Sequence, residues 1–147
     1  MAALLVLVLS GCGSQLLGPG EQRELEAAQA RWEAAALPSY AFDYRRICFC
    51  VDGGRLVRIT VQAGEVSSVT AADTQGPLAD PSAGSWPTVA QLFTRLEGHA
   101  EGGSRDGWTL DVEYDATLGY PTEIKLVAPE NIADGGSTER VTGLTAT

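Results

Sequence analysis

The sequence predicts an α+β domain: an antiparallel β-sheet with two helices packed on one face, in the order α-β-β-β-α-β-β(-β). Two segments carry apolar residues at helical spacing, and several others carry them at alternate positions, with short turns between them. Alternation leaves one polar face on each strand, which is typical of antiparallel sheets whose other face is covered by helices. The 147 residues suit one domain with one core.

Both predicted helices have clear start or stop signals. The first covers residues 21–36, which are rich in Glu, Ala, Gln and Arg, all good helix formers. The second opens at Thr88, where Thr88 and Gln91 fit a capping box, and we expect it to end at Gly98 or Gly102.

The strands are predicted from their alternation. The first covers residues 39–51, and its apolar phase slips after Tyr44, which a bulge near Arg46 would explain. The other predicted strands cover residues 55–63, 66–71 and 108–114, a segment through Tyr120, Ile124 and Leu126, and residues 139–145. Residues 73–87 hold three prolines and two glycines, so they form a long loop, and such loops are mobile or functional.

One face of the sheet is predicted to pack against both helices. The strand residues that share its phase are Leu110, Val112, Tyr114, Ile124 and Leu126, and the facing helix residues are Trp32, Leu92, Phe93 and Leu96.

The N-terminus has the order of a lipoprotein export signal. Residues 2–9 form an unbroken apolar run, followed by Ser10, Gly11 and Cys12. This order resembles the lipobox of bacterial lipoproteins, which implies diacylglycerol on the cysteine, cleavage before it and acylation of the new N-terminus. No Lys or Arg precedes the run, which departs from the usual signal peptide. The alternative is a buried N-terminal element that ends in Ser-Gly-Cys.

The lipoprotein interpretation divides the chain into three parts. Residues 1–11 are a signal peptide, residues 12–20 are the lipidated Cys12 and a flexible tether, and residues 21–147 are the folded domain. The predicted location is the cell envelope, with the protein held on a bacterial membrane by its lipid. In a host with two membranes, Gly13 after the cysteine fits sorting outward, to the outer membrane or the cell surface.

The charge limits the partners. The formal net charge of −9 opposes binding to nucleic acid, whose phosphates require Lys and Arg. It also gives no attraction to anionic lipid, and no apolar run approaches the roughly 18–20 residues that span a bilayer. We therefore expect attachment through the lipid alone and an envelope protein or peptide as partner.

Signatures of enzymes are missing from the sequence. The only histidine, His99, falls at the end of a predicted helix, and neither a glycine-rich phosphate loop nor a Gly-x-Ser-x-Gly elbow occurs. We predict a protein that is not an enzyme and uses no cofactor.

Four local patterns look familiar when they are set side by side. They are Trp32 before Tyr40-Ala41-Phe42-Asp43-Tyr44, then Cys48-Phe49-Cys50, then Pro87-Thr88-Val89 with Leu92-Phe93, then Tyr114-Asp115 with Gly119-Tyr120-Pro121-Thr122. Their order and spacing, over about residues 31–134, resemble the bacterial family DUF6174, whose members are often predicted lipoproteins. The resemblance implies fold and export, and it implies no activity because the function of the family is unknown.

Cys48 and Cys50 are the most suggestive pair for chemistry. With Cys12 lipidated, these two thiols remain, and in an oxidising compartment such a pair usually forms a disulfide. Residues two apart in a strand lie near the upper limit of disulfide reach, so the bond requires a bend. The alternative is a thiol-redox or soft-metal-handling role, although two thiolates are too few for a closed zinc site.

Tyr114, Asp115 and Tyr120 form a candidate binding cluster. They flank the turn that ends at Gly119, where Asp accepts backbone hydrogen bonds and Gly adopts positive φ. A hairpin built from turn-forming residues explains all of them, and a ligand site on the same loop is the alternative.

Overall fold

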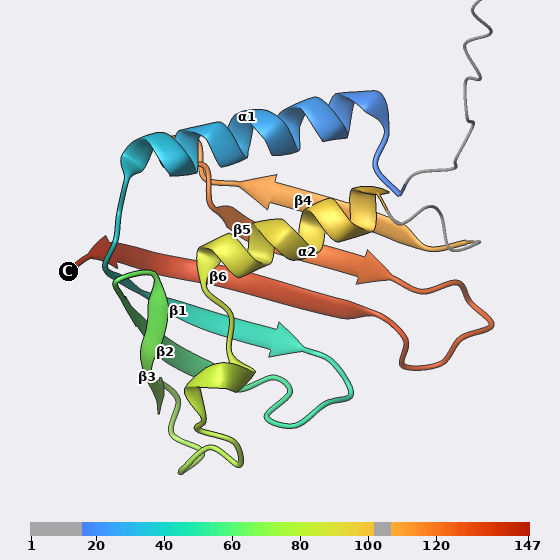
Figure 1. Cartoon of the computed structure of the whole chain (residues 1–147). Coiled ribbons are helices and arrows are strands. Elements are labelled where there is room, and N and C mark those ends of the chain that lie inside the picture. The colour runs from blue at the N-terminus through green and yellow to red at the C-terminus, as the bar shows by residue number, and fades with distance from the viewer. Residues whose placement is uncertain (1–15, 102–106) are drawn as a thin grey trace, which may run out of the picture.

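The computed structural model describes residues 16–101 and 107–147, which form a six-stranded antiparallel sheet with two helices on one face (Figure 1). The elements are α1 (Pro19–Ala35), β1 (Tyr40–Ile47), β2 (Leu56–Gln62), β3 (Glu65–Ala71), the 3-10 helix η1 (Ala83–Ser85), α2 (Val89–Glu101), β4 (Thr109–Tyr114), β5 (Pro121–Val127) and β6 (Ser137–Ala146). This order confirms the predicted α+β class. The strands lie in the order β3-β2-β1-β6-β5-β4, so the last strand of the chain is central.

Helix α1 begins earlier than the sequence suggested. Pro19 occupies its first turn, where the missing N–H costs nothing, and the Gly18 amide donates to the Glu21 carboxylate at 2.7 Å. Leu17 is only 3% exposed and belongs to the core. The predicted tether over residues 12–20 is therefore too long, because the packed structure already includes Leu17.

Strand β1 ends earlier than predicted, and its irregularity lies elsewhere. The register with β6 shifts between Ala41 and Asp43, not near Arg46, which pairs regularly with Glu139. The apolar alternation stops after Tyr44 because the strand is about to end, at Ile47, and not because of a bulge.

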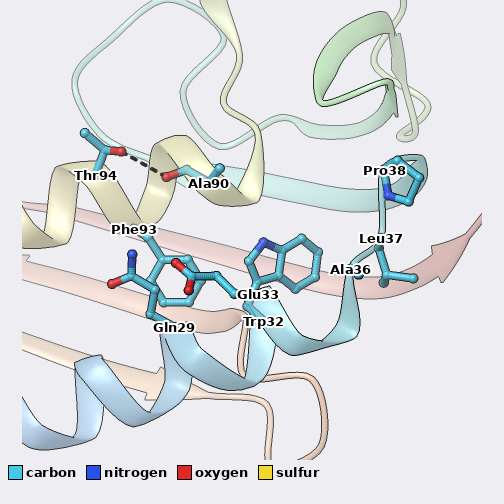
Figure 2. Close-up of a pocket in the computed structure, with 9 residues that line it drawn as sticks. All are labelled: Gln29, Trp32, Glu33, Ala36, Leu37, Pro38, Ala90, Phe93 and Thr94. Atoms are coloured by element: carbon cyan, nitrogen blue, oxygen red, sulfur yellow. Dashed lines mark hydrogen bonds between the residues drawn. The ribbon is translucent and has the colours of Figure 1, made fainter.

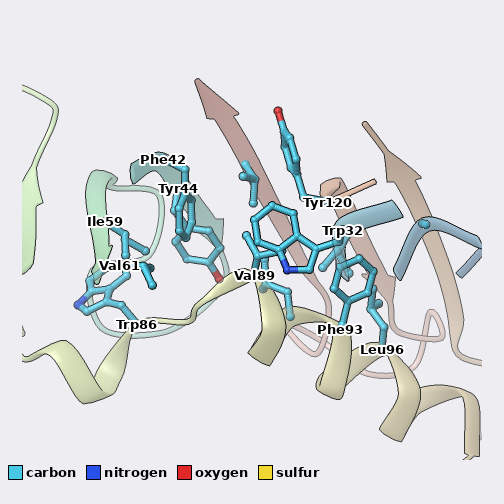
Figure 3. Close-up of a cluster of buried hydrophobic side chains, with 14 of the residues drawn as sticks. Trp32, Phe42, Tyr44, Ile59, Val61, Trp86, Val89, Phe93, Leu96 and Tyr120 are labelled. Carbon is cyan, nitrogen blue, oxygen red and sulfur yellow. The ribbon is translucent and has the colours of Figure 1, made fainter. Parts of the chain in front are cut away.

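The core lies between the sheet and the helices. It contains every residue of the predicted helix stripe, with Leu110 and Ile124 buried and Val112, Tyr114 and Leu126 packed against it. Edge-to-face contacts join Trp32 to Tyr40 at 5.1 Å between ring centroids and Tyr44 to Trp86 at 6.2 Å. Figure 3 shows this cluster, with Trp32, Phe93 and Leu96 beside α2 and with Phe42 and Tyr44 on β1.

Helix α2 has the predicted N-terminus. The Thr88 hydroxyl accepts the Gln91 amide hydrogen at 3.1 Å, and the Thr88 amide donates to the Gln91 side chain at 2.8 Å, which confirms the capping box. The buried Tyr40 hydroxyl accepts the Val89 amide hydrogen at 3.1 Å. Gly98 does not end the helix, which continues to Glu101; Gly102 lies outside the described residues.

The long loop before α2 is held in place by side chains from the β1–β2 connection. Arg55 donates to both oxygens of Asp73, with its shortest contacts at 2.9 Å. The Asp52 carboxylate accepts two further amide hydrogens of the loop, including that of Asp80 at 2.8 Å. The Trp86 indole N–H donates to the Asp80 carbonyl at 2.9 Å. These bonds fix the backbone that leads into α2.

Candidate functional site

The predicted cysteine pair lies in a bend directly after β1. Cys48 and Cys50 are at disulfide-bonding distance, with 5.3 Å between their Cα atoms, and Cys50 is exposed. The Gly54 amide donates to the Arg46 carbonyl at 2.7 Å, which closes the loop onto the end of β1. The predicted lipidation site, Cys12, lies outside the described residues.

The predicted binding cluster is built into a hairpin that packs on α1. The Asp115 carboxylate accepts the amide hydrogens of Thr117 at 3.0 Å and Leu118 at 2.6 Å, so it is occupied by its own turn. Tyr120 is 9% exposed and lies edge-on to Trp32. Tyr114 stacks on a core ring instead, with 6.4 Å between its centroid and that of Phe93. Each of the three residues thus has a role in the turn or in the packing of the hairpin, and the binding cluster stays a prediction.

A buried polar cluster that the sequence analysis missed lies between β1, β6 and α2. The Tyr44 hydroxyl donates to the Glu139 carboxylate at 2.6 Å. Arg95 donates to both oxygens of the same carboxylate, at 3.1 and 2.8 Å. Tyr44 is fully buried and Glu139 is 8% exposed, while the Arg95 side chain is 42% exposed. Arg95 therefore bonds the cluster through its guanidinium group while part of its side chain is exposed to solvent.

The electrostatics of the cluster follow from burial and from the carboxylate. Burial, followed by the charge of Glu139, raises the pKa of Tyr44 and keeps its hydroxyl protonated as a donor. Burial opposes the charged form of Arg95, but the charge of Glu139 and the interactions with Tyr44 together outweigh it, and the pKa of Arg95 is raised. The cluster is a neutral tyrosine joined to an ion pair.

A cationic pocket opens beside this cluster. It has a volume of about 320 Å³ and is lined by Arg46, Gly84, Ser85, Trp86, Pro87, Gln91, Thr94 and Arg95. Within the described residues, Arg46 has no carboxylate partner, and its buried Nε has no hydrogen-bond acceptor. The ordered loop supplies one wall through Trp86 and Pro87, and α2 supplies the other. We call this the Arg46–Arg95 pocket.

A larger hollow of about 400 Å³ lies between the two helices (Figure 2). Trp32 and Phe93 contribute buried rings to it, and Glu33 is the one charged side chain among the described residues that line it. The Thr94 hydroxyl is already used, since it donates to the Ala90 carbonyl at 3.2 Å. This groove presents few groups that could orient a ligand, so the Arg46–Arg95 pocket is the better candidate.

The sequence did carry a signal for the missed site. Arg46 continues the inward phase of Tyr44 on β1, and Glu139 takes an inward position beside Val141 on β6. A charged residue in the buried phase of a strand is unusual and needs a partner or a function. Recognising it requires the pairing of β1 with β6, which are far apart in the chain.

Two further features bear on function. In residues 16–101 and 107–147, no helix is long and apolar enough to cross a membrane. In that same part of the chain, no group of three or more His, Cys, Asp or Glu side chains could hold a metal ion.

Comparison with known proteins gives a family and no named activity. No curated protein matches the chain. The model of a family of unknown function, DUF6174, matches residues 24–146, which is most of the sequence and includes the whole sheet. The chain therefore belongs to the DUF6174 family.

Proposed function

We propose that this protein is an exported lipoprotein, anchored to a bacterial membrane through Cys12, and that its domain binds an anionic group of an envelope peptide or polymer without catalysing a reaction. The N-terminal order of apolar run, small residues and cysteine supports the anchor. The Arg46–Arg95 pocket supports the ligand class, a carboxylate or phosphate.

The observation that carries the ligand proposal is the state of Arg46. A guanidinium whose Nε is buried without an acceptor has lost its hydrogen bond to water, which costs free energy. A bound anion would accept a hydrogen bond from this group and offset that cost. Within residues 16–101 and 107–147, Arg31 and Arg45 also have a buried Nε without a hydrogen-bond partner, but neither lines this pocket. Arg95 is held in a bidentate pair, so its outward donors are already oriented.

Anion binding is tested by titrating the protein with inorganic phosphate and with acetate at constant ionic strength, followed by NMR shifts. We expect saturable shifts at pocket residues, and we expect Arg46→Gln to abolish them. The control is Arg45→Gln, which removes the same charge from the adjacent residue on the opposite face of the sheet. Equal losses in both variants would mean that net charge, and not the pocket, attracts the anion.

The anchor is tested separately with Cys12→Ser. We expect the variant to leave the membrane fraction and to remain unprocessed, because the lipid is its proposed attachment. A variant that still sediments with membranes would contradict the lipoprotein proposal, whatever the pocket binds.

A second candidate function is thiol-redox or soft-metal chemistry at Cys48 and Cys50. It is favoured by the exposure of Cys50, which makes the pair accessible to reductants or metal ions. Thiol titration of denatured, unreduced protein distinguishes the states. A paired state gives no free thiol from these cysteines, whereas two free thiols would favour the metal-handling role.

A further inference from the structure

Exposed apolar side chains gather at one end of the sheet. In the part of the chain that the structure describes, the exposed large apolar residues are Ile47, Phe49, Val51, Val127 and Ile132, with exposures of 46%, 90%, 63%, 52% and 41%. They lie at the ends of β1 and β5 and in the loops that follow, which Figure 1 shows on the same side of the molecule. We call this group the apolar end.

The pairing of the strands brings these residues to one level. Ile47 and Lys125 both pair with Thr138 of β6, so the C-terminal ends of β1 and β5 lie at the same end of the sheet. Ile47, Val127 and Ile132 line one shallow hollow of about 370 Å³. Phe49 and Val51 lie in the loop that follows β1 and contains Cys48 and Cys50, which we call the cysteine loop. Exposed apolar residues that gather at one end of a domain in this way indicate an interaction surface.

The N-terminal segment leaves the domain at the same end. Leu17 lies with Leu110 at the start of β4, and Leu110 pairs with Leu126 beside Val127. Three residues separate Cys12 from Leu16, so the chain between them spans at most about 14 Å. A lipid on Cys12 would therefore hold the apolar end at the membrane surface.

We propose that the apolar end lies against the membrane, with Phe49 and Val51 inserted into the lipid interface. This inference rests on the proposed anchor at Cys12. Charges of both signs flank the end, Arg45 and Lys125 against Glu130 and Asp134, so the contact is apolar and does not depend on anionic lipid. In this orientation the strands extend from the membrane surface into the solvent.

The three phenylalanines of the chain provide the test. Phe42 and Phe93 are 0% and 2% exposed, and Phe49 is 90% exposed, so one site reports and two serve as internal controls. The full chain is labelled with fluorophenylalanine, isolated from membranes and reconstituted in phosphatidylcholine vesicles. Its ¹⁹F spectrum is recorded with a nitroxide on the lipid acyl chain and, separately, with a water-soluble paramagnetic agent.

We expect the acyl nitroxide to remove the Phe49 resonance while Phe42 and Phe93 persist, and we expect vesicles to protect Phe49 from the soluble agent. Val51→Asp should restore the Phe49 resonance, because a charge beside it opposes insertion. Ala63→Asp, an exposed position in the β2–β3 turn at the other end of the sheet, should leave the result unchanged.

Mass spectrometry of the same sample separates the two proposals. If the chain is acylated and the soluble agent still broadens the Phe49 resonance in vesicles, the membrane contact is overturned and the anchor is left intact. An unacylated chain contradicts the anchor, and the contact is then judged on the full chain added to the same vesicles. Protection of Phe49 that rises with protein density, without broadening by the acyl nitroxide, would assign the apolar end to a second copy of the chain and overturn the inference.

Discussion

The substitution Glu139→Gln tests the buried cluster and the pocket together. It keeps the shape of the side chain and removes the charge that accepts three hydrogen bonds, one from Tyr44 and two from Arg95. Weakening the bond of the fully buried Tyr44 hydroxyl costs about 1–2 kcal/mol. The Arg95 side chain is 42% exposed and regains water, so its lost pairing adds only about 0.5–1 kcal/mol. We expect the free energy of unfolding to fall by about 1.5–3 kcal/mol.

The same substitution should strengthen anion binding. It removes a negative charge beside the Arg46–Arg95 pocket, and one unit charge at short range in a half-exposed site contributes about 1 kcal/mol, or about fivefold in Kd. The assays are urea unfolding followed by tryptophan fluorescence, since Trp86 contacts Tyr44, and the phosphate titration. Glu130→Gln, in an exposed loop, is the control with an expected change below about 0.5 kcal/mol. An unchanged stability would show that the cluster does not consolidate the fold, and weaker phosphate binding would place the anion elsewhere.

Three other predictions concern the scaffold. Gly119→Ala should lower the free energy of unfolding by more than about 3 kcal/mol, because the residue has φ 82° and a Cβ would lie 2.1 Å from the Ala28 carbonyl oxygen. The control Gly98→Ala, in open space on α2, should raise the free energy of unfolding by about 0.5–1 kcal/mol. Equal effects of the two substitutions in urea unfolding would contradict the docking of the hairpin on α1. Leu92→Ala and Phe93→Ala, at sites 0% and 2% exposed, should each cost about 2–5 kcal/mol, and near-zero changes for both would refute the helix-on-sheet core. Burial raises the pKa of all four tyrosines from the ordinary value of 10.0, so their contribution to stability is complete below about pH 10 and is lost as the pH rises above it; a flat stability profile from pH 9 to about 12 would contradict this.

The fold class was predictable because local pattern and global packing agree in most elements. Val57, Ile59 and Val61 alternate strictly and are fully buried on one face of β2. The boundaries were less predictable where a residue has two roles. Pro19 reads as a loop former but suits the first turn of a helix, and Phe49 reads as a continuing strand residue but is 90% exposed in a loop.

The candidate site was less predictable than the fold because its members meet only through long-range pairing. Tyr44 and Glu139 are 95 positions apart, and Arg95 reaches them from a helix between the two strands in the sequence. From composition and spacing alone, Arg46 is predicted to be an ordinary surface charge. Arg46 lines a pocket because β1 ends one residue later, at Ile47, and because the loop before α2 forms the opposite wall. Neither feature can be read from the sequence around Arg46.

Hydrogen bonds from the β1–β2 connection fix the backbone at Arg46 and in the loop that forms one wall of the Arg46–Arg95 pocket. The cysteine loop closes back on the Arg46 carbonyl, which fixes the backbone of that residue at the end of β1. The β1–β2 connection also supplies Asp52 and Arg55, which bind the loop before α2 and thereby set the wall that contains Trp86. The loop wall of the pocket and the end of β1 that carries Arg46 are thus both tied to the one short segment between β1 and β2. The backbone on each side of the guanidinium is held before any ligand arrives, so binding an anion there would require little ordering, which is the condition for affinity in a shallow pocket.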